Sequence, residues 1–274
     1  MLKKLLRNTP FFPILKKIYR LIKMVPRHPL QDRKEVDGYN ILHLGTKYGG
    51  WSFVDEDYLN GCTIISAGLG EDASFDIEFA RKYNAKVIIV DPTPRSIKHF
   101  EEIMSSIGTL SSTPYLDDGK QPISAYDLSS LSDANFQLVE KALWDKKDRL
   151  RFFEPANPLH VSHSIVNFQN NYSNETKFIE VDAITLDLLL TELNINSSDL
   201  LLLKLDIEGA EIEVLTHCLS KGILPRQILV EFDELRVPSD RGFKRATKMD
   251  ELLIKNGYKM LKTDGEADFL YYRD

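Results

Sequence analysis

Apolar residues along the chain fall into short continuous runs that alternate with longer amphipathic segments. The runs are typical of strands buried on both faces, and the amphipathic segments are typical of helices. Strands are expected at 63–67, 86–90, 149–153, 200–205 and 227–232, helices at 74–83, 94–107, 184–193, 211–220 and 248–256, and regular structure also at 136–143. A terminal antiparallel pair is expected at 258–261 and 267–272. The pattern predicts an α/β fold with a mostly parallel sheet.

Two polar segments interrupt this alternation. Residues 110–132 are rich in Ser, Pro, Asp and Gly, and they are expected to form a surface excursion. Residues 161–175 include His163 with several Asn and Ser, and we place them in a loop near the site. Neither segment carries a recognisable code for a ligand.

The length and composition indicate one large domain with its own core, since 43% of the 274 residues are apolar. We expect a domain over 36–274, preceded by an extension over 1–35. Cys62 and Cys218 lie far apart and have no metal-ligand spacing, which disfavours a disulfide framework or a zinc site and favours a reducing, cytoplasmic setting.

The formal net charge of −6 is unevenly distributed. The first 30 residues hold eight Lys and Arg and no acid, so the remainder carries a charge of −14. An acidic body repels nucleic-acid phosphates, so we expect no nucleic-acid partner unless the basic arm supplies the contact. The basic arm has the spacing of an amphipathic helix that lies on the inner face of an anionic membrane or packs on the domain, and its apolar runs are too short to span a bilayer. Both alternatives stay open.

The expected strand ends carry the candidate chemistry, because parallel sheets bind ligands beyond the carboxyl ends of their strands. Gly68 and Gly70 follow the first strand of the alternation and would let backbone N–H groups approach a ligand. Asp91 ends the next strand about 20 residues later, near the spacing at which an acid binds ribose hydroxyls. These residues indicate a nucleoside-containing cofactor.

Glu71 and Asp72 follow the glycine pair, where carboxylates would repel a pyrophosphate. They favour a cofactor with a positive or zwitterionic centre over a dinucleotide. A nicotinamide-dependent oxidoreductase on a similar sheet is therefore the second interpretation, because Ala73 stands where the third glycine of a dinucleotide motif is expected. A non-catalytic, membrane-associated binding protein is the third.

Residues 202–211 read Leu-Leu-Lys-Leu-Asp-Ile-Glu-Gly-Ala-Glu, and Val214 and Leu215 follow. This segment resembles the signature of the FkbM-like methyltransferases, a resemblance that extends from about residue 48 to the C-terminus. Looser matches are Asp91-Pro92-Thr93-Pro94, Ala142-Leu143, residues 181–190 and Glu231. The chain departs from the family pattern at Ser66, where the first glycine motif usually begins with an acid.

The resemblance implies a Rossmann-like class I methyltransferase fold, with a mostly parallel seven-stranded sheet, a C-terminal antiparallel strand and S-adenosyl-L-methionine as cofactor. It also implies the cofactor contacts. The methionine portion would be lined by Ala67, Gly68 and Gly70, with Glu71 or Asp72 near its amino group. The ribose would be held by Asp91. The adenine would be enclosed by Pro92, Thr93, Ala142 and Leu143. Residues 48–51 would form a lid, although Trp51 is equally well interpreted as a core aromatic.

The activity that the resemblance implies is O-methylation of a hydroxyl on a saccharide or another small molecule. Methyl transfer is an in-line displacement, so the protein must align the acceptor and remove one proton. Asp206 is the first candidate for that role, followed by Glu208 and His163. Asp206 would alternatively bind substrate or cap the next helix, and Glu211 is expected in the first turn of that helix. Asp206, Glu208 and Glu231 also suit Mg²⁺, so a divalent cation stays an alternative that we do not predict.

Overall fold

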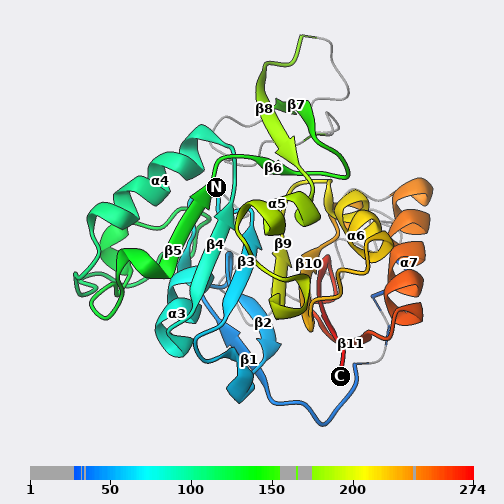
Figure 1. Ribbon diagram of the computed structural model, residues 1–274, viewed down its shortest axis with the longest axis horizontal. Helices are drawn as coiled ribbons and strands as arrows, with labels where there is room; N and C mark the ends of the chain where they lie inside the picture. Colours follow the sequence, from blue (N-terminus) through cyan, green and yellow to red (C-terminus); the bar gives the residue numbers. More distant parts are fainter. Residues whose placement is uncertain (1–27, 32, 34, 155–164, 166–174, 237–238) are drawn as a thin grey trace, which may run out of the picture.

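The computed structural model describes residues 28–31, 33, 35–154, 165, 175–236 and 239–274 (Figure 1). The basic arm over 1–27 and the candidate base His163 therefore lie outside the described residues.

A seven-stranded sheet forms the centre of the fold, in the order β11-β12-β10-β9-β3-β4-β5. Its strands are β3 (Thr63–Ala67), β4 (Lys86–Val90), β5 (Phe136–Val139), β9 (Leu202–Leu205), β10 (Gln227–Glu231), β11 (Lys259–Thr263) and β12 (Asp268–Tyr272). The first five are parallel to one another, and β12 runs antiparallel to both β10 and β11. This confirms the predicted class I methyltransferase arrangement.

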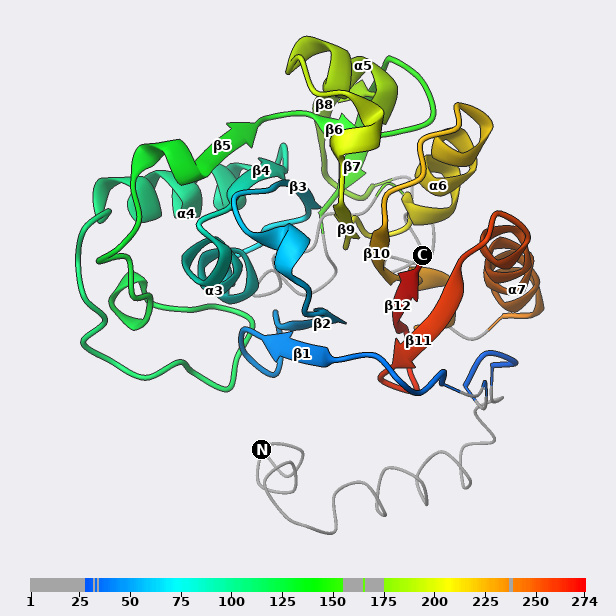
Figure 2. The same ribbon diagram turned by 60° about the horizontal axis from the view of Figure 1, so that its bottom comes forward.

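Both faces of the central sheet are covered, as Figure 2 shows. The helices α5 (Leu186–Glu192), α6 (Glu211–Ser220) and α7 (Asp240–Lys255) bury one face, and α3 (Ser74–Tyr83) and α4 (Pro94–Ser105) bury the other. Alternate residues of β9 supply the two apolar layers, with Leu203 and Leu205 on the α6 side and Leu202 on the α3 side. Near-continuous apolar strands thus explain the buried sheet.

A short hairpin, β1 (Ile41–Leu44) with β2 (Trp51–Val54), completes the α3 layer. These two strands were not predicted, because four-residue runs are too short to show a period. The hairpin is fixed to the sheet by Gln227 of β10, whose side-chain amide exchanges two hydrogen bonds with the backbone of Val54, at 2.8 and 2.9 Å.

A second, three-stranded sheet lies between β5 and α5 in the chain and projects at the top of Figure 1. Its order is β6-β8-β7, with β6 (Ala142–Leu143), β7 (Asp148–Phe153) and β8 (Phe178–Ile184).

The prediction of a helix from residue 184 was wrong at its start, because Ile184 ends β8 and Thr185 caps α5. The prediction of α7 from residue 248 began too late, since Ser239 caps this helix by accepting the N–H of Gly242.

The remaining regular elements are short 3₁₀ turns. They are η1 (Asp57–Leu59), η2 (Ile123–Ala125), η3 (Asp133–Asn135), η4 (Ser197–Asp199) and η5 (Asp233–Leu235). The stretch 110–132 otherwise holds no helix or strand, and residues 110–120 are mostly exposed, as predicted for a surface excursion. The prediction was wrong for the second half, because Tyr126, Leu128 and Leu131 are buried in the α3 layer.

The end of the predicted extension contacts the domain. Leu30 is buried in the α6 layer, and Arg33 forms an ion pair with Asp250 of α7. Leu30 and Arg33 thus contact the domain although they precede the predicted boundary at residue 35. That boundary stays a prediction. In the part of the chain that the structure describes, no helix is long and apolar enough to cross a membrane.

Candidate active site

The direction of strand order reverses between β3 and β9, at the centre of the sheet. From β3 the chain builds outward through β4 to β5, and β9 begins the other half through β10. Such a switch point leaves a crevice beyond the carboxyl ends of the two strands, where α/β sheets bind their ligands. The predicted glycine turn after β3 and the predicted carboxylates after β9 meet there.

Gly68 lies directly against Asp206. The backbone N–H of Asp206 donates to the carbonyl of Ala67 at 3.1 Å, and a Cβ on Gly68 would overlap the backbone oxygen of Asp206. Gly68 and Gly70 both have positive φ, +86° and +59°. A Cβ on Gly70 would have no heavy atom within 4 Å, so this side of the turn opens into space. The first glycine allows the close approach and the second leaves room for a ligand.

Asp91 organises the glycine turn. Its Oδ2 accepts the N–H groups of Leu69 at 2.9 Å and Gly70 at 3.3 Å, and the hydroxyl of Ser96 at 2.8 Å. Its Oδ1 accepts the N–H and the hydroxyl of Thr93, at 2.9 and 2.7 Å. The buried carboxylate thus joins the ends of β3 and β4, which places the turn and the predicted ribose position side by side.

Glu71 and Asp72 are buried and bind protein groups. Glu71 forms ion pairs with Arg95 and with Lys120, the latter at 2.7 Å, and these cations lower the pKa of its carboxyl against the opposing effect of burial. Asp72 accepts the Thr46 hydroxyl at 2.6 Å and the Ser74 N–H at 3.0 Å. The two acids therefore fix the turn to α4 and to the loop before β2.

Asp206 and Glu208 sit on a tight turn after β9. Glu208 has φ +55°, in the left-handed region, and Gly209 follows at +100°. Burial raises the pKa of Asp206, against the opposing charges of Lys204 and Arg236. A carboxyl with a raised pKa is a better proton acceptor than an ordinary aspartate.

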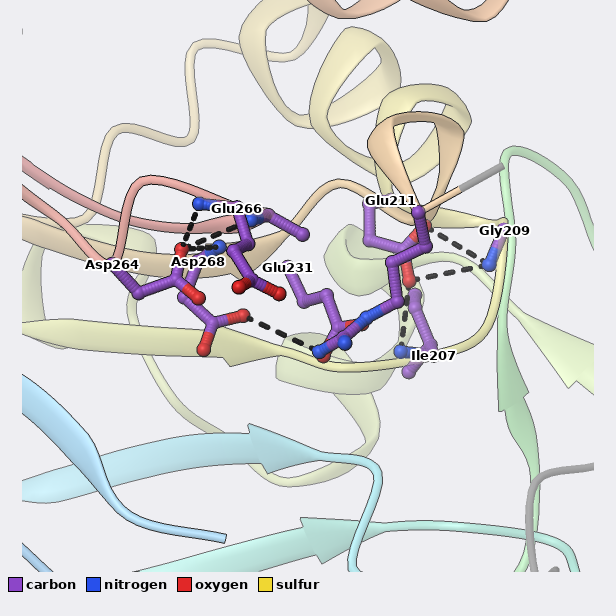
Figure 3. Close-up of polar contacts among 9 residues, drawn as sticks. Ile207, Gly209, Glu211, Glu231, Asp264, Glu266 and Asp268 are labelled. Carbon is purple, nitrogen blue, oxygen red and sulfur yellow. Dashed lines mark hydrogen bonds and ion pairs between the residues drawn. The ribbon is translucent and has the colours of Figure 1, made fainter. Parts of the chain in front are cut away.

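Glu211 stabilises this turn and begins α6. Its carboxylate accepts the N–H of Ile207 at 2.9 Å and the N–H of Gly209 at 3.0 Å, as the dashed lines in Figure 3 show. It is fully buried, and burial together with the charge of Asp233 raises its pKa. This confirms its place in the first helical turn.

A second group of acids, which the sequence reading largely missed, lies one strand further along. Glu231 at the end of β10 is the Cα partner of Asp268 at the start of β12, and Figure 3 shows both beside Asp264. Arg236 forms an ion pair with Glu231 and lies 3.9 Å from Asp268. Burial and neighbouring carboxylates raise the pKa of Glu231 to about 7 and that of Asp268 to about 8. Pairing across the antiparallel strands is the signal that would have located Asp268.

The other predicted contacts are distributed around these strand ends. Trp51 is 5% exposed in the α3 layer, as expected for a core aromatic, whereas Tyr48 is 68% exposed. Desolvation and the charges of Asp206, Glu208 and Glu231 raise the pKa of Tyr48 to about 12. Ala142 and Leu143 are buried in β6, beyond β5.

Thr93 is buried and Pro92 half-buried in the loop between β4 and α4.

A cavity of about 210 Å³ opens between the β1–β2 hairpin and the β11–β12 pair. Trp51, Asp264 and Asp268 line it, so it reaches the second acidic group. Among the described residues, no group of three or more His, Cys, Asp or Glu side chains is arranged to hold a metal ion.

These features fit an adenosyl cofactor. The glycine turn approaches β9 closely, the space beside Gly70 is open, and the Asp91 carboxylate lies at the adjoining strand end. The fold and the site are those of a Rossmann-like enzyme, with an open glycine turn at the switch point of its sheet.

The comparison with protein families narrows this class. The chain belongs to the Methyltransferase FkbM domain family, whose profile matches residues 60–260. It is accordingly an S-adenosylmethionine-dependent methyltransferase, as its sequence indicated.

No curated relative matches the chain. Among solved structures, a crystal structure of M. jannaschii TYW2 in complex with AdoMet covers 88% of this chain and 90% of that one, with 10% identity and a TM-score of 0.30. This likeness is too weak to support a conclusion about the chain.

Proposed function

We propose that the protein transfers the methyl group of S-adenosylmethionine to a hydroxyl of a saccharide or another small molecule. One observation carries this proposal: the glycine turn of the cofactor site touches the strand end that carries Asp206. A proton acceptor beside the cofactor turn is the arrangement that transfer to a hydroxyl needs.

The cofactor supplies an electrophilic methyl group when bound. In our proposal Ala67, Gly68 and Gly70 line its methionine portion, and Asp91 holds the turn and faces the ribose. Pro92, Thr93, Ala142 and Leu143 enclose the adenine. Glu71 and Asp72 maintain the turn through their bonds to Arg95, Lys120 and Thr46.

Asp206 accepts the hydroxyl proton of the acceptor at a carboxylate oxygen, and Glu208 is the second candidate for this step. His163 stays a further candidate outside the described residues. The cavity of about 210 Å³ that Trp51 and Asp268 line is the entrance that we propose for the acceptor. Its mixture of carboxylates and apolar groups suits a hydroxyl-bearing small molecule.

Methyl-labelled S-adenosylmethionine, incubated with the full-length protein and fractionated pools of saccharides and other hydroxyl-bearing small molecules, tests the proposal. Label in an ether-linked methyl group of one product is expected, and base-stable label rules out an ester. Asp206→Asn is the matched control, since it retains the side-chain volume and removes the proton acceptor. Label on nitrogen or carbon would refute O-methylation.

The basic arm is a separate proposal. We propose that residues 1–28 hold the protein at an anionic, cytoplasmic membrane face. Co-sedimentation with vesicles of anionic and of neutral lipid tests it, with a variant lacking residues 1–28 as the control. Equal sedimentation of both proteins would refute it.

A further inference from the structure

Lys204 is a buried cation beneath the glycine turn. Only 3% of it is exposed, and it lies in the middle of the sheet, beside Ser66 of β3 and Leu229 of β10. Strand alternation places Leu203 and Leu205 in the α6 layer, so Lys204 enters the apolar α3 layer with Leu202. An ammonium in such a layer is costly unless it is paired, and its position calls for a specific partner.

That partner is the turn itself. The Lys204 Nζ donates to the carbonyl oxygen of Gly68 at 2.6 Å and lies 3.5 Å from the carbonyl oxygen of Ala67. It also stands 5.6 Å from the centroid of the Trp51 ring, within cation–π range. The ammonium therefore fixes the direction of the Gly68 carbonyl, on a residue whose backbone is otherwise permissive.

The charge of Lys204 also acts on a buried acid of α3. Asp76, in the first turn of that helix, is 2% exposed, and burial raises the pKa of its carboxyl against the opposing charge of Lys204. Asp76 Oδ1 and the Ser66 hydroxyl are both buried, and neither makes a hydrogen bond of good geometry among the described residues.

The turn is held from two sides. Asp91 accepts the N–H groups of Leu69 and Gly70 from the β4 side. Lys204 binds the Gly68 carbonyl from the β9 side. Opposite charges thus act on the carbonyl and the N–H of the same Gly68–Leu69 peptide group, and each restricts rotation that the glycines would allow.

We propose that Lys204, with Asp76 as its counter-charge, is a positioning residue that sets the Gly68–Gly70 turn in the shape that binds the methionine portion of S-adenosylmethionine. This inference rests on the cofactor placement proposed above. It is independent of which molecule accepts the methyl group.

The test uses the full-length protein and four variants: Lys204→Met, Asp76→Asn, the double variant, and Lys248→Met as a matched control on the exposed face of α7. Calorimetry gives the Kd for S-adenosylmethionine and for its demethylated product. Thermal unfolding without ligand gives the Tm of each protein. The two readouts separate positioning from folding.

Lys204→Met should raise both Kd values about 10- to 100-fold, the range for loss of one charge-assisted hydrogen bond, and should lower the Tm. The double variant also removes the buried carboxylate charge, so its Tm should return toward the wild-type value. Its Kd should stay high. Lys248→Met should match the wild type in both readouts.

Recovery of the Kd together with the Tm in the double variant would show a purely structural role and overturn the inference. If Lys204→Met does not fold, the double variant alone decides, and a Kd within about threefold of wild type overturns the inference. Absence of binding by the wild type would instead overturn the cofactor placement, and the inference with it.

Discussion

Gly68→Ala perturbs the contact on which the proposed site depends. An alanine at φ +86° costs about 1–2 kcal/mol for the left-handed backbone alone. Its Cβ would also stand 1.8 Å from the backbone oxygen of Asp206. That oxygen is fixed by the pairing of β3 with β9, so relief requires separation of two central strands, an overpacking cost of about 1–3 kcal/mol. We expect a total loss of about 2–5 kcal/mol.

Urea unfolding of the full-length protein measures this loss, with Gly222→Ala as the control. Gly222 also has positive φ, +68°, but a Cβ there meets no atom within 4 Å, so only the backbone cost of about 1–2 kcal/mol applies. Gly70→Ala should resemble Gly222→Ala in stability and yet weaken S-adenosylmethionine binding, because its Cβ enters the open space beside the turn. A stability loss for Gly68→Ala no larger than that of Gly222→Ala would refute the reasoning.

Three further outcomes are expected. Glu211→Ala should lower the free energy of unfolding by about 2–4 kcal/mol, because it leaves buried backbone N–H groups without an acceptor, and a urea titration showing under about 1 kcal/mol would contradict this role. Asp91→Ala should raise the Kd for S-adenosylmethionine, whereas Asp206→Ala should abolish turnover with a smaller change in Kd. Calorimetry measures the Kd and label transfer measures turnover. The reverse pattern would contradict the roles proposed for the two residues. Burial raises the pKa of Asp268 to about 8 in the native state, compared with about 3.9 in an unfolded chain. The native state therefore binds more protons than the unfolded state between these pH values. Stability is accordingly lost as the pH rises from about 4 to about 8. Asp268→Asn should therefore gain stability relative to wild type at pH 9 compared with pH 5, and equal differences at both pH values would argue against it.

The sequence predicted most of the central sheet because β3, β4, β9 and β10 are apolar runs with clear ends. For β5 it indicated only regular structure over 136–143. The run 63–67 stops at Gly68, and the run 200–205 stops at Asp206, so strand ends and chemistry coincide. Parallel pairing then brings those ends together without further information. The meeting of the glycine turn with the β9 carboxylates was predictable for this reason.

The rest of the site depends on contacts that periodicity does not contain. The β1–β2 hairpin is attached through the Gln227 side chain, and the register of β12 decides that Asp268 faces Glu231. Glu71 reads from the sequence as a group free to meet the cofactor, but its ion pairs come from Arg95 and Lys120, far along the chain. Strand ends were therefore predictable, whereas the partners of buried charges required the tertiary structure.

The adjacency of β3 and β9 also has a consequence for synthesis of the chain. β3 ends at Ala67 and its neighbour β9 begins at Leu202, so one edge of a strand rich in isoleucine stays unpaired until most of the polypeptide has been made. An open apolar edge is a template for association with other chains. During translation, one edge of the strand that leads into the Gly68–Gly70 turn thus stays open until β9 has been made. A chain truncated before β9 is expected to aggregate rather than to fold into half of the domain.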